Sequence, residues 1–174
     1  MIVWITGISG SGKTTISNRV YNKYKDKFSN LVKVDGDVVR EIFGNDLGFD
    51  KQSRIEQIKR IQKLCTFLEG QGLIVLVAAL YSDNDLMAWN RSNFKNYYEI
   101  YLKASIDLVK SRDPKGLYKK FYIGQEQNIV GLDIDYNEPK HYDLKINMDE
   151  VFSIEEAFEK IVNNINFPIR EYNN

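Results

Sequence analysis

Hydrophobic and polar positions follow two different rhythms along the chain. Short apolar runs such as residues 73–80 contain almost no polar side chains, which is typical of strands covered on both faces of a parallel sheet. Longer segments such as residues 53–70 repeat apolar positions at helical spacing. Because the two kinds of segment alternate, the pattern predicts an α/β fold with a parallel sheet. The expected strands are residues 2–5, 31–34, 73–80, 98–102 and 143–146, and the expected helices are residues 13–27, 38–43, 53–70, 85–93, 105–111, 116–122 and 154–164.

Residues 123–140 follow neither rhythm. This segment is punctuated by glycine and proline, and loops of such length in a compact domain are usually functional or disordered. A basic stretch that includes Arg112 and Lys115 precedes it. Cations that close over a transferring phosphoryl group stabilise its spread negative charge. We therefore expect a lid over about residues 112–140, with Arg112 as a catalytic residue.

Residues 7–14 match the phosphate-binding pattern G-x-x-x-x-G-K-[ST], between an expected strand and an expected helix. Glycines let the backbone curl so that its N–H groups meet phosphate oxygens at a helix N-terminus. Lys13 supplies a charge to the β- and γ-phosphates of ATP, and the Thr14 hydroxyl is a magnesium ligand. The predicted ATP-binding residues are Gly7, Ser9, Gly10, Ser11, Gly12, Lys13, Thr14 and Thr15.

Two carboxylates and an arginine follow the second expected strand. Asp35, Asp37 and Arg40 stand where ligands bind in open α/β sheets, at the carboxyl end of a strand. One carboxylate can order magnesium or accept a hydroxyl proton, and Arg40 can hold an anionic acceptor. Lys13, Asp35 and Asp37 are the catalytic candidates, with Asp35 a second candidate for magnesium; the spacing does not separate the roles of the two aspartates.

Composition narrows the class of protein further. The 174 residues predict one domain over residues 1–174, and the formal net charge of zero predicts neither nucleic acid nor membrane as a partner. A single cysteine, Cys65, fits a core position in a reducing compartment, so we expect a cytoplasmic protein.

Three functional classes share a phosphate-binding loop of this kind. A guanine-reading N-K-x-D motif is missing, which argues against a GTPase switch, and no strand ends in the acidic pair of a motor ATPase. A small-molecule kinase remains, with a non-catalytic nucleotide-binding regulator as the alternative from another class. The intact Lys13, Thr14 and Asp35 favour the kinase.

Several motifs together resemble the adenylylsulfate kinases, from Trp4 to about Ile146. They are W-I-T-G-I-S-G-S-G-K-T-T at residues 4–15, D-G-D at 35–37, D-L-G-F at 46–49 and R-D-P-K-G-L-Y-K at 112–119. The resemblance implies a nucleoside-kinase-like fold in three layers with a five-stranded parallel sheet, and transfer from ATP to a ribose 3′-hydroxyl. It also implies a homodimer, and an acceptor nucleotide contacted by Asp37, Arg40, Phe49, Arg54 and Lys115. Asp35 is then the best candidate for the carboxylate near the attacking 3′-hydroxyl.

The departures from the family pattern fall on the acceptor side. Gln57 replaces an asparagine, and Ile129 replaces a phenylalanine that stacks on adenine. After the third strand the family has Ile-Ser-Pro-Tyr, where this chain has Ala79, Leu80, Tyr81 and Ser82. We count Gln57, Leu80, Tyr81 and Ile129 among the acceptor-binding residues. Losing the ring costs stacking of about 1–3 kcal/mol per base, and a smaller base suffers least. The sequence thus resembles members acting on cytidine diphosphoramidate in capsule phosphoramidate pathways, with adenylylsulfate as the alternative acceptor.

Overall fold

The computed structural model describes residues 1–81 and 83–167. Five parallel strands form one sheet in the order β2-β3-β1-β4-β5. Their bounds are Ile2–Thr6 for β1, Leu31–Asp35 for β2, Ile74–Ala78 for β3, Tyr97–Lys103 for β4 and Leu144–Asn147 for β5. The predicted fold class, α/β with a five-stranded parallel sheet, is therefore confirmed.

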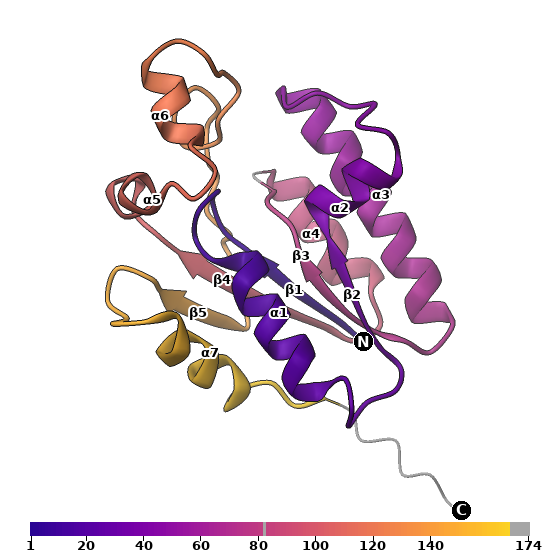
Figure 1. Ribbon diagram of the computed structural model, residues 1–174. Coiled ribbons are helices and arrows are strands. Elements are labelled where there is room, and N and C mark those ends of the chain that lie inside the picture. Colours follow the sequence, from indigo (N-terminus) through magenta and orange to yellow (C-terminus); the bar gives the residue numbers. More distant parts are fainter. Residues whose placement is uncertain (82, 168–174) are drawn as a thin grey trace, which may run out of the picture.

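Helices cover both faces of this sheet, which gives three layers (Figure 1). Helices α1 (Lys13–Tyr24) and α7 (Ile154–Val162) pack on one face, and α3 (Lys51–Gly70) and α4 (Asn84–Asn93) pack on the other. The short helix α2 (Gly36–Ile42) precedes α3. Helices α5 (Ile106–Arg112) and α6 (Leu117–Tyr122) follow β4, and α6 stands beyond the sheet, opposite α2 and the start of α3.

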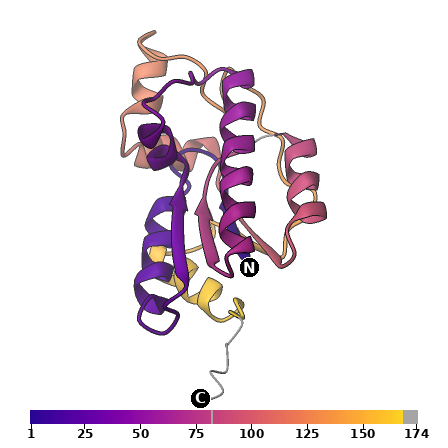
Figure 2. The ribbon, with the colours of Figure 1, turned by 90° about the vertical axis from the view of Figure 1, so that its right-hand side faces the viewer.

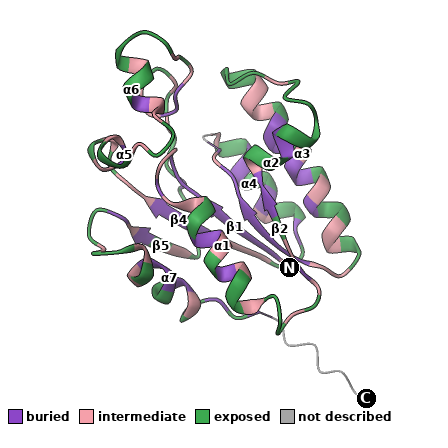
Figure 3. Ribbon diagram, in the orientation of Figure 1, coloured by how far each residue is buried: buried purple, intermediate pink, exposed green. Residues whose placement is uncertain are grey.

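Two large apolar cores lie on the two faces of the sheet. Ile5, Ile16 and Ile161 belong to the core under α1 and α7, whereas Trp4 and Ile61 belong to the core under α3. The purple strands at the centre of Figure 3 show how completely the sheet is covered. Every residue of β1 and β3 is buried, as the unbroken apolar runs predicted.

The predicted bounds are close to the observed ones, and the differences have local causes. Helix α3 begins at Lys51 rather than at residue 53, because the Asp50 carboxylate accepts a hydrogen bond from the Ser53 N–H and so caps the helix two residues earlier. Strand β3 ends at Ala78, two residues before the predicted end. Ala79 is buried and its N–H still donates to the Ile5 carbonyl oxygen at 3.2 Å, whereas Leu80 is half-buried and lies past the last ladder contact.

The expected lid occupies the connection from α5 to β5. Residues 123–143 contain no helix or strand, only an isolated bridge between Val130 and Ile134. Two carboxylates organise the connection: Asp113 accepts the N–H groups of Tyr118 and Lys119 at the start of α6, and Asp133 accepts the N–H groups of Asn128 and Ile129. Figure 2 shows the orange trace of this segment passing beside α3.

No helix in the described ranges is long and apolar enough to cross a membrane.

Candidate active site

The phosphate-binding loop connects β1 to α1 at the carboxyl edge of the sheet. Gly7, Gly10 and Gly12 have φ values of 151°, 80° and 100°, a region that favours glycine. A Cβ on Gly7 would lie 2.5 Å from the Leu102 carbonyl oxygen, so that position also needs a residue without a side chain. Gly12 precedes α1 without a side-chain cap. The helix N-terminus is thereby left to an anion.

Lys13 lies inside this loop. Its ammonium group donates a hydrogen bond of 2.9 Å to the carbonyl oxygen of Ile8. Burial lowers the pKa of Lys13 to about 8, although Asp37 and Asp35 oppose that shift. The lysine thus occupies the interior of the loop, where the β- and γ-phosphates of ATP are expected.

Asp35 is the buried carboxylate of the site. One of its oxygens accepts a hydrogen bond of 2.9 Å from the Thr14 hydroxyl, and the other accepts the Asp37 N–H at 3.0 Å. Asp35 therefore caps α2 and touches the predicted magnesium ligand at the same time. Thr14 and Asp35 offer two hard oxygen donors side by side, which fits magnesium bound mainly through phosphates and water. No group of three or more His, Cys, Asp or Glu residues in the described chain could hold a metal by itself.

Asp37 faces the lid. Its carboxylate forms an ion pair of 2.5 Å with the Lys115 ammonium, and both side chains are more than half exposed. An exposed pair of this kind contributes little stability, so it can open and close readily. Arg112 lies nearby in sequence at the end of α5, but within the described residues its side chain has no hydrogen bond or ion pair. Its catalytic role stays a prediction.

An exposed aromatic ring stands beside these carboxylates. Phe49 is 51% exposed, and the guanidinium carbons of Arg40 and Arg54 lie 4.6 and 5.5 Å from its ring centroid. Arg40 also donates to the carbonyl oxygens of Leu47 and Gly48, which fixes the loop that carries the ring. Arg54 donates to the Phe49 carbonyl and to the Asn128 carbonyl of the lid. Three predicted acceptor residues thus lie together, although Arg40 is only 7% exposed and the Phe49 ring is their open part.

Gln57, Leu80 and Tyr81 are less open than predicted. Gln57 is buried and donates to the Gly36 carbonyl, which joins α3 to the start of α2. Leu80 and Tyr81 line a small pocket with Arg54. Tyr81 is only 2% exposed, and its hydroxyl lies 3.2 Å from the Tyr97 hydroxyl in the core. Acceptor contact by these three residues stays a prediction, and Ser82 lies outside the described residues.

Ile129 packs inside a small third core at the base of the lid. It is 1% exposed and shares this core with Ile8 of the phosphate-binding loop, Val109 of α5 and Tyr118 of α6. The structure therefore shows a packing role for Ile129. Contact with an acceptor base stays a prediction, since the side chain presents no open face.

Sequence reasoning missed two polar residues, Tyr118 and Glu99. Tyr118 donates from its hydroxyl to the Ser9 carbonyl in the phosphate-binding loop, at 2.9 Å. Glu99 is fully buried in β4, where the Tyr97 hydroxyl donates to it at 2.9 Å. A carboxylate in the middle of an apolar run was a signal for Glu99, and Tyr118 stands in the R-D-P-K-G-L-Y-K motif, which gave no indication of its partner.

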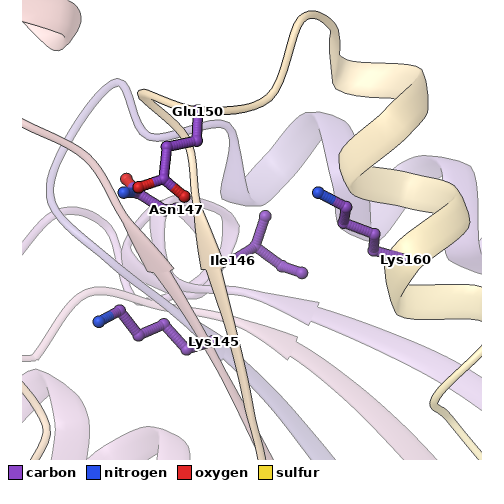
Figure 4. Close-up of a pocket in the computed structure, with 5 residues that line it drawn as sticks. All are labelled: Lys145, Ile146, Asn147, Glu150 and Lys160. Carbon is purple, nitrogen blue, oxygen red and sulfur yellow. The ribbon is translucent and has the colours of Figure 1, made fainter.

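A separate pocket lies between β5 and α7, away from these residues (Figure 4). Lys160 extends from α7 toward β5 and is paired with Glu156 at 2.8 Å. None of the predicted site residues lines this pocket, which is formed by Lys145, Ile146, Asn147, Glu150 and Lys160.

A glycine loop that encloses a lysine, and a hydrogen-bonded threonine and aspartate at the carboxyl edge of a β2-β3-β1-β4-β5 sheet, define a P-loop kinase. Comparison with protein families narrows this class. Residues 1–147 match the model of the adenylylsulphate kinase family, and the chain belongs to that family.

Individual relatives cover nearly the whole chain. The cytidine diphosphoramidate kinase of Campylobacter jejuni subsp. jejuni is 41% identical over 161 residues, which is 92% of this chain and 94% of that protein. The adenylyl-sulfate kinase of Oceanobacillus iheyensis is 36% identical over 164 residues, with 92% and 81% covered. Among solved structures, the Mycobacterium tuberculosis APS kinase in complex with AMPPNP and APS has a TM-score of 0.84 at 32% identity, with 93% and 95% covered.

Proposed function

We propose that this kinase transfers the γ-phosphoryl group of ATP to the ribose 3′-hydroxyl of cytidine diphosphoramidate. The observation that carries the proposal is the 41% identity, over 92% of the chain, to a cytidine diphosphoramidate kinase. The departures at Gln57, Tyr81 and Ile129 support it, because the family pattern has acceptor-binding residues at these positions while the phosphate-binding loop is intact. The same kinship suggests a role in making capsule phosphoramidate.

On the donor side, the loop N–H groups and Lys13 bind the phosphates. Lys13 meets the charge that grows on the β–γ bridging oxygen as the bond from that oxygen to the γ-phosphorus breaks. Magnesium, when bound, would neutralise charge on the β- and γ-phosphates, with Thr14 and Asp35 as the protein side of its shell. The products are ADP and a nucleotide with a new bond between O3′ and phosphorus.

On the acceptor side, Asp37 and Lys115 form the ion pair described above. Asp37 would orient the 3′-hydroxyl and receive its proton, while Lys115 turns to the transferring phosphoryl group. Phe49 would support the base, and Arg40 with Arg54 would hold the anionic diphosphoramidate. This assignment separates Asp35, on the metal side, from Asp37, on the acceptor side.

The test is a side-by-side measurement of kcat/KM for cytidine diphosphoramidate, cytidine diphosphate and adenylylsulfate, each with ATP and magnesium. We expect the highest value for cytidine diphosphoramidate. A value for adenylylsulfate equal to or above both cytidine compounds would establish the second candidate, an adenylylsulfate kinase. The observation behind this second candidate is the 36% identity to the Oceanobacillus iheyensis enzyme. Phosphorylation of none of the three would support a non-catalytic regulator.

We also propose a cytoplasmic location, where ATP is available. The homodimer that the resemblance implies is a further proposal, which light scattering on the purified protein tests.

A further inference from the structure

Tyr118 connects the lid to the phosphate-binding loop, and phosphoryl transfer as described gives it no task. Its hydroxyl donates to the Ser9 carbonyl oxygen at 2.9 Å, and its ring is 2% exposed within the third core. Burial raises the pKa of Tyr118 to about 12, so the phenol keeps its proton throughout the physiological range and remains a donor. The hydrogen bond joins α6 to a loop more than a hundred residues earlier.

The accepting carbonyl belongs to the same peptide unit as the Gly10 N–H. In a trans peptide these two groups point in opposite directions. A carbonyl drawn toward Tyr118 therefore turns the Gly10 N–H away from Tyr118. The Ile8 carbonyl, one peptide earlier, already accepts hydrogen bonds from the Lys13 ammonium and the Ser11 N–H. The Ser9 carbonyl instead accepts its hydrogen bond from Tyr118.

Glycine at position 10 makes this peptide free to rotate. Gly10 has a φ of 80°, and without a Cβ it can adopt either orientation of the preceding peptide at little steric cost. Rotation would aim the Ser9 carbonyl dipole at the phosphates and remove one N–H donor from the anion site. A hydrogen bond from outside the loop is a direct way to select one orientation.

We propose that Tyr118 is a positioning residue that holds the Ser9–Gly10 peptide in its phosphate-binding orientation. Tyr118 also lies close in sequence to a residue of the acceptor side. Lys115, three residues earlier, pairs with Asp37 on the acceptor side, so one short segment contacts both halves of the site. The proposal rests on the ATP binding proposed above.

The decisive variant is Tyr118→Phe, which removes the hydroxyl and keeps the ring in the core. The probe is a non-hydrolysable ATP analogue with magnesium, titrated calorimetrically. We expect the dissociation constant to rise by roughly twofold to tenfold, as for loss of one hydrogen bond. kcat/KM for ATP should fall by a similar factor. The dissociation constant of the acceptor, measured without nucleotide, should not change.

A matched control is available on the same helix. Tyr122 is 60% exposed in α6, and Tyr122→Phe removes a hydroxyl without touching the loop. We expect this variant to bind the analogue as the wild type does. The Gly10 amide signal in nuclear magnetic resonance spectra should differ between wild type and Tyr118→Phe before any ligand is added.

Two results would overturn the positioning role. One is an unchanged analogue affinity in Tyr118→Phe. The other is an equal loss of analogue and acceptor affinity with a lowered melting temperature, which would identify a merely structural contact. Failure of the wild type to bind the analogue would instead refute the proposed use of ATP.

Discussion

Asp35 and Asp37 differ in their contacts although they are two residues apart in sequence. Asp35 is 6% exposed and bonds to Thr14, whereas Asp37 is exposed and pairs with Lys115 of the lid. Spacing alone could not separate them, because both carboxylates follow the same strand. The partners that distinguish the two roles come from elements far away along the chain.

The two aspartates should fail in different ways when neutralised. Asp35→Asn keeps the helix cap but loses the charge next to Thr14, so we expect a large fall in kcat and a raised magnesium requirement. Asp37→Asn should mainly raise the KM for the acceptor. Steady-state kinetics at several magnesium concentrations separates the effects. Identical magnesium dependence in both variants would contradict the division of roles.

Lys13 gives the enzyme a predictable response to alkaline pH. Its pKa of about 8 means that the free enzyme loses this charge as the pH rises through 8. The protonated form binds phosphate, so kcat/KM for ATP should fall about tenfold per pH unit above that value. Bound phosphates favour the ammonium form, so the fall in kcat should begin at higher pH. Coincident profiles for the two parameters would contradict this explanation.

Glu99 should make the protein less stable as the pH rises, which is the opposite of a carboxylate whose pKa is lowered by a partner. Burial raises its pKa, so its destabilising charge develops as the pH rises from the unfolded-state pKa through the folded-state pKa. Glu99→Gln should therefore raise the melting temperature at pH 8 and have less effect toward pH 4.

Glu156 provides the matched control, because its hydrogen bond with Lys160 lowers its pKa. Its contribution is present above the unfolded-state pKa and is lost as the pH falls. Glu156→Gln should therefore lower the melting temperature slightly at pH 8. Parallel curves for Glu99→Gln and wild type between pH 4 and 8 would refute the assignment to Glu99.

Among the elements, the lid shows what could and could not be read from sequence. The absence of helix and strand over residues 123–143 was predictable because weak periodicity is a local signal, while the action of this connection as a lid over about residues 112–140 stays a prediction. Its internal order was not predictable. Asp113 and Asp133 each accept two backbone N–H groups, and Arg54 of α3 donates to the Asn128 carbonyl across 74 positions of sequence. Such contacts depend on the completed fold.

Ligand-dependent closure of the lid is the prediction at this level. Backbone amides of residues 123–140 should exchange hydrogen more slowly when an ATP analogue and the acceptor are both bound. Amides of α7 should change little and serve as an internal reference. Equal exchange of the lid with and without ligands would show that the lid does not close.

At the level of the whole molecule, the two large cores share the strands between them. The sequence predicted this arrangement well, since apolar runs and helical periodicity depend on burial, which the sheet imposes on every strand. The third core was not predictable. Ile8, Val109, Tyr118 and Ile129 come from four separate segments, and each looks ordinary in its own segment.

Shared strands predict one cooperative unfolding transition. Ile16→Ala on one face and Ile61→Ala on the other should each lower the free energy of unfolding by about 2–5 kcal/mol. Circular dichroism and tryptophan fluorescence should report the same urea midpoint in each variant. Ile129→Ala should affect lid exchange more than the global midpoint. Different midpoints from the two probes within either large-core variant would indicate that the faces unfold independently.

The ring of Phe49, with Arg40 and Arg54 over it, has a consequence for ligand fragments. In the proposed acceptor site, a base that stacks on this ring competes with the two guanidinium groups for the ring face, and an anion can then replace the contact that those groups lose. A nucleoside offers the base without the anion, and a free diphosphate offers the anion without the base. The nucleoside alone leaves the arginines without an anion, and the diphosphate alone leaves the Phe49 ring without a base. The binding free energy of the intact nucleotide should therefore exceed the sum of those of its halves, so that dissected fragments make poor leads for an inhibitor of this enzyme.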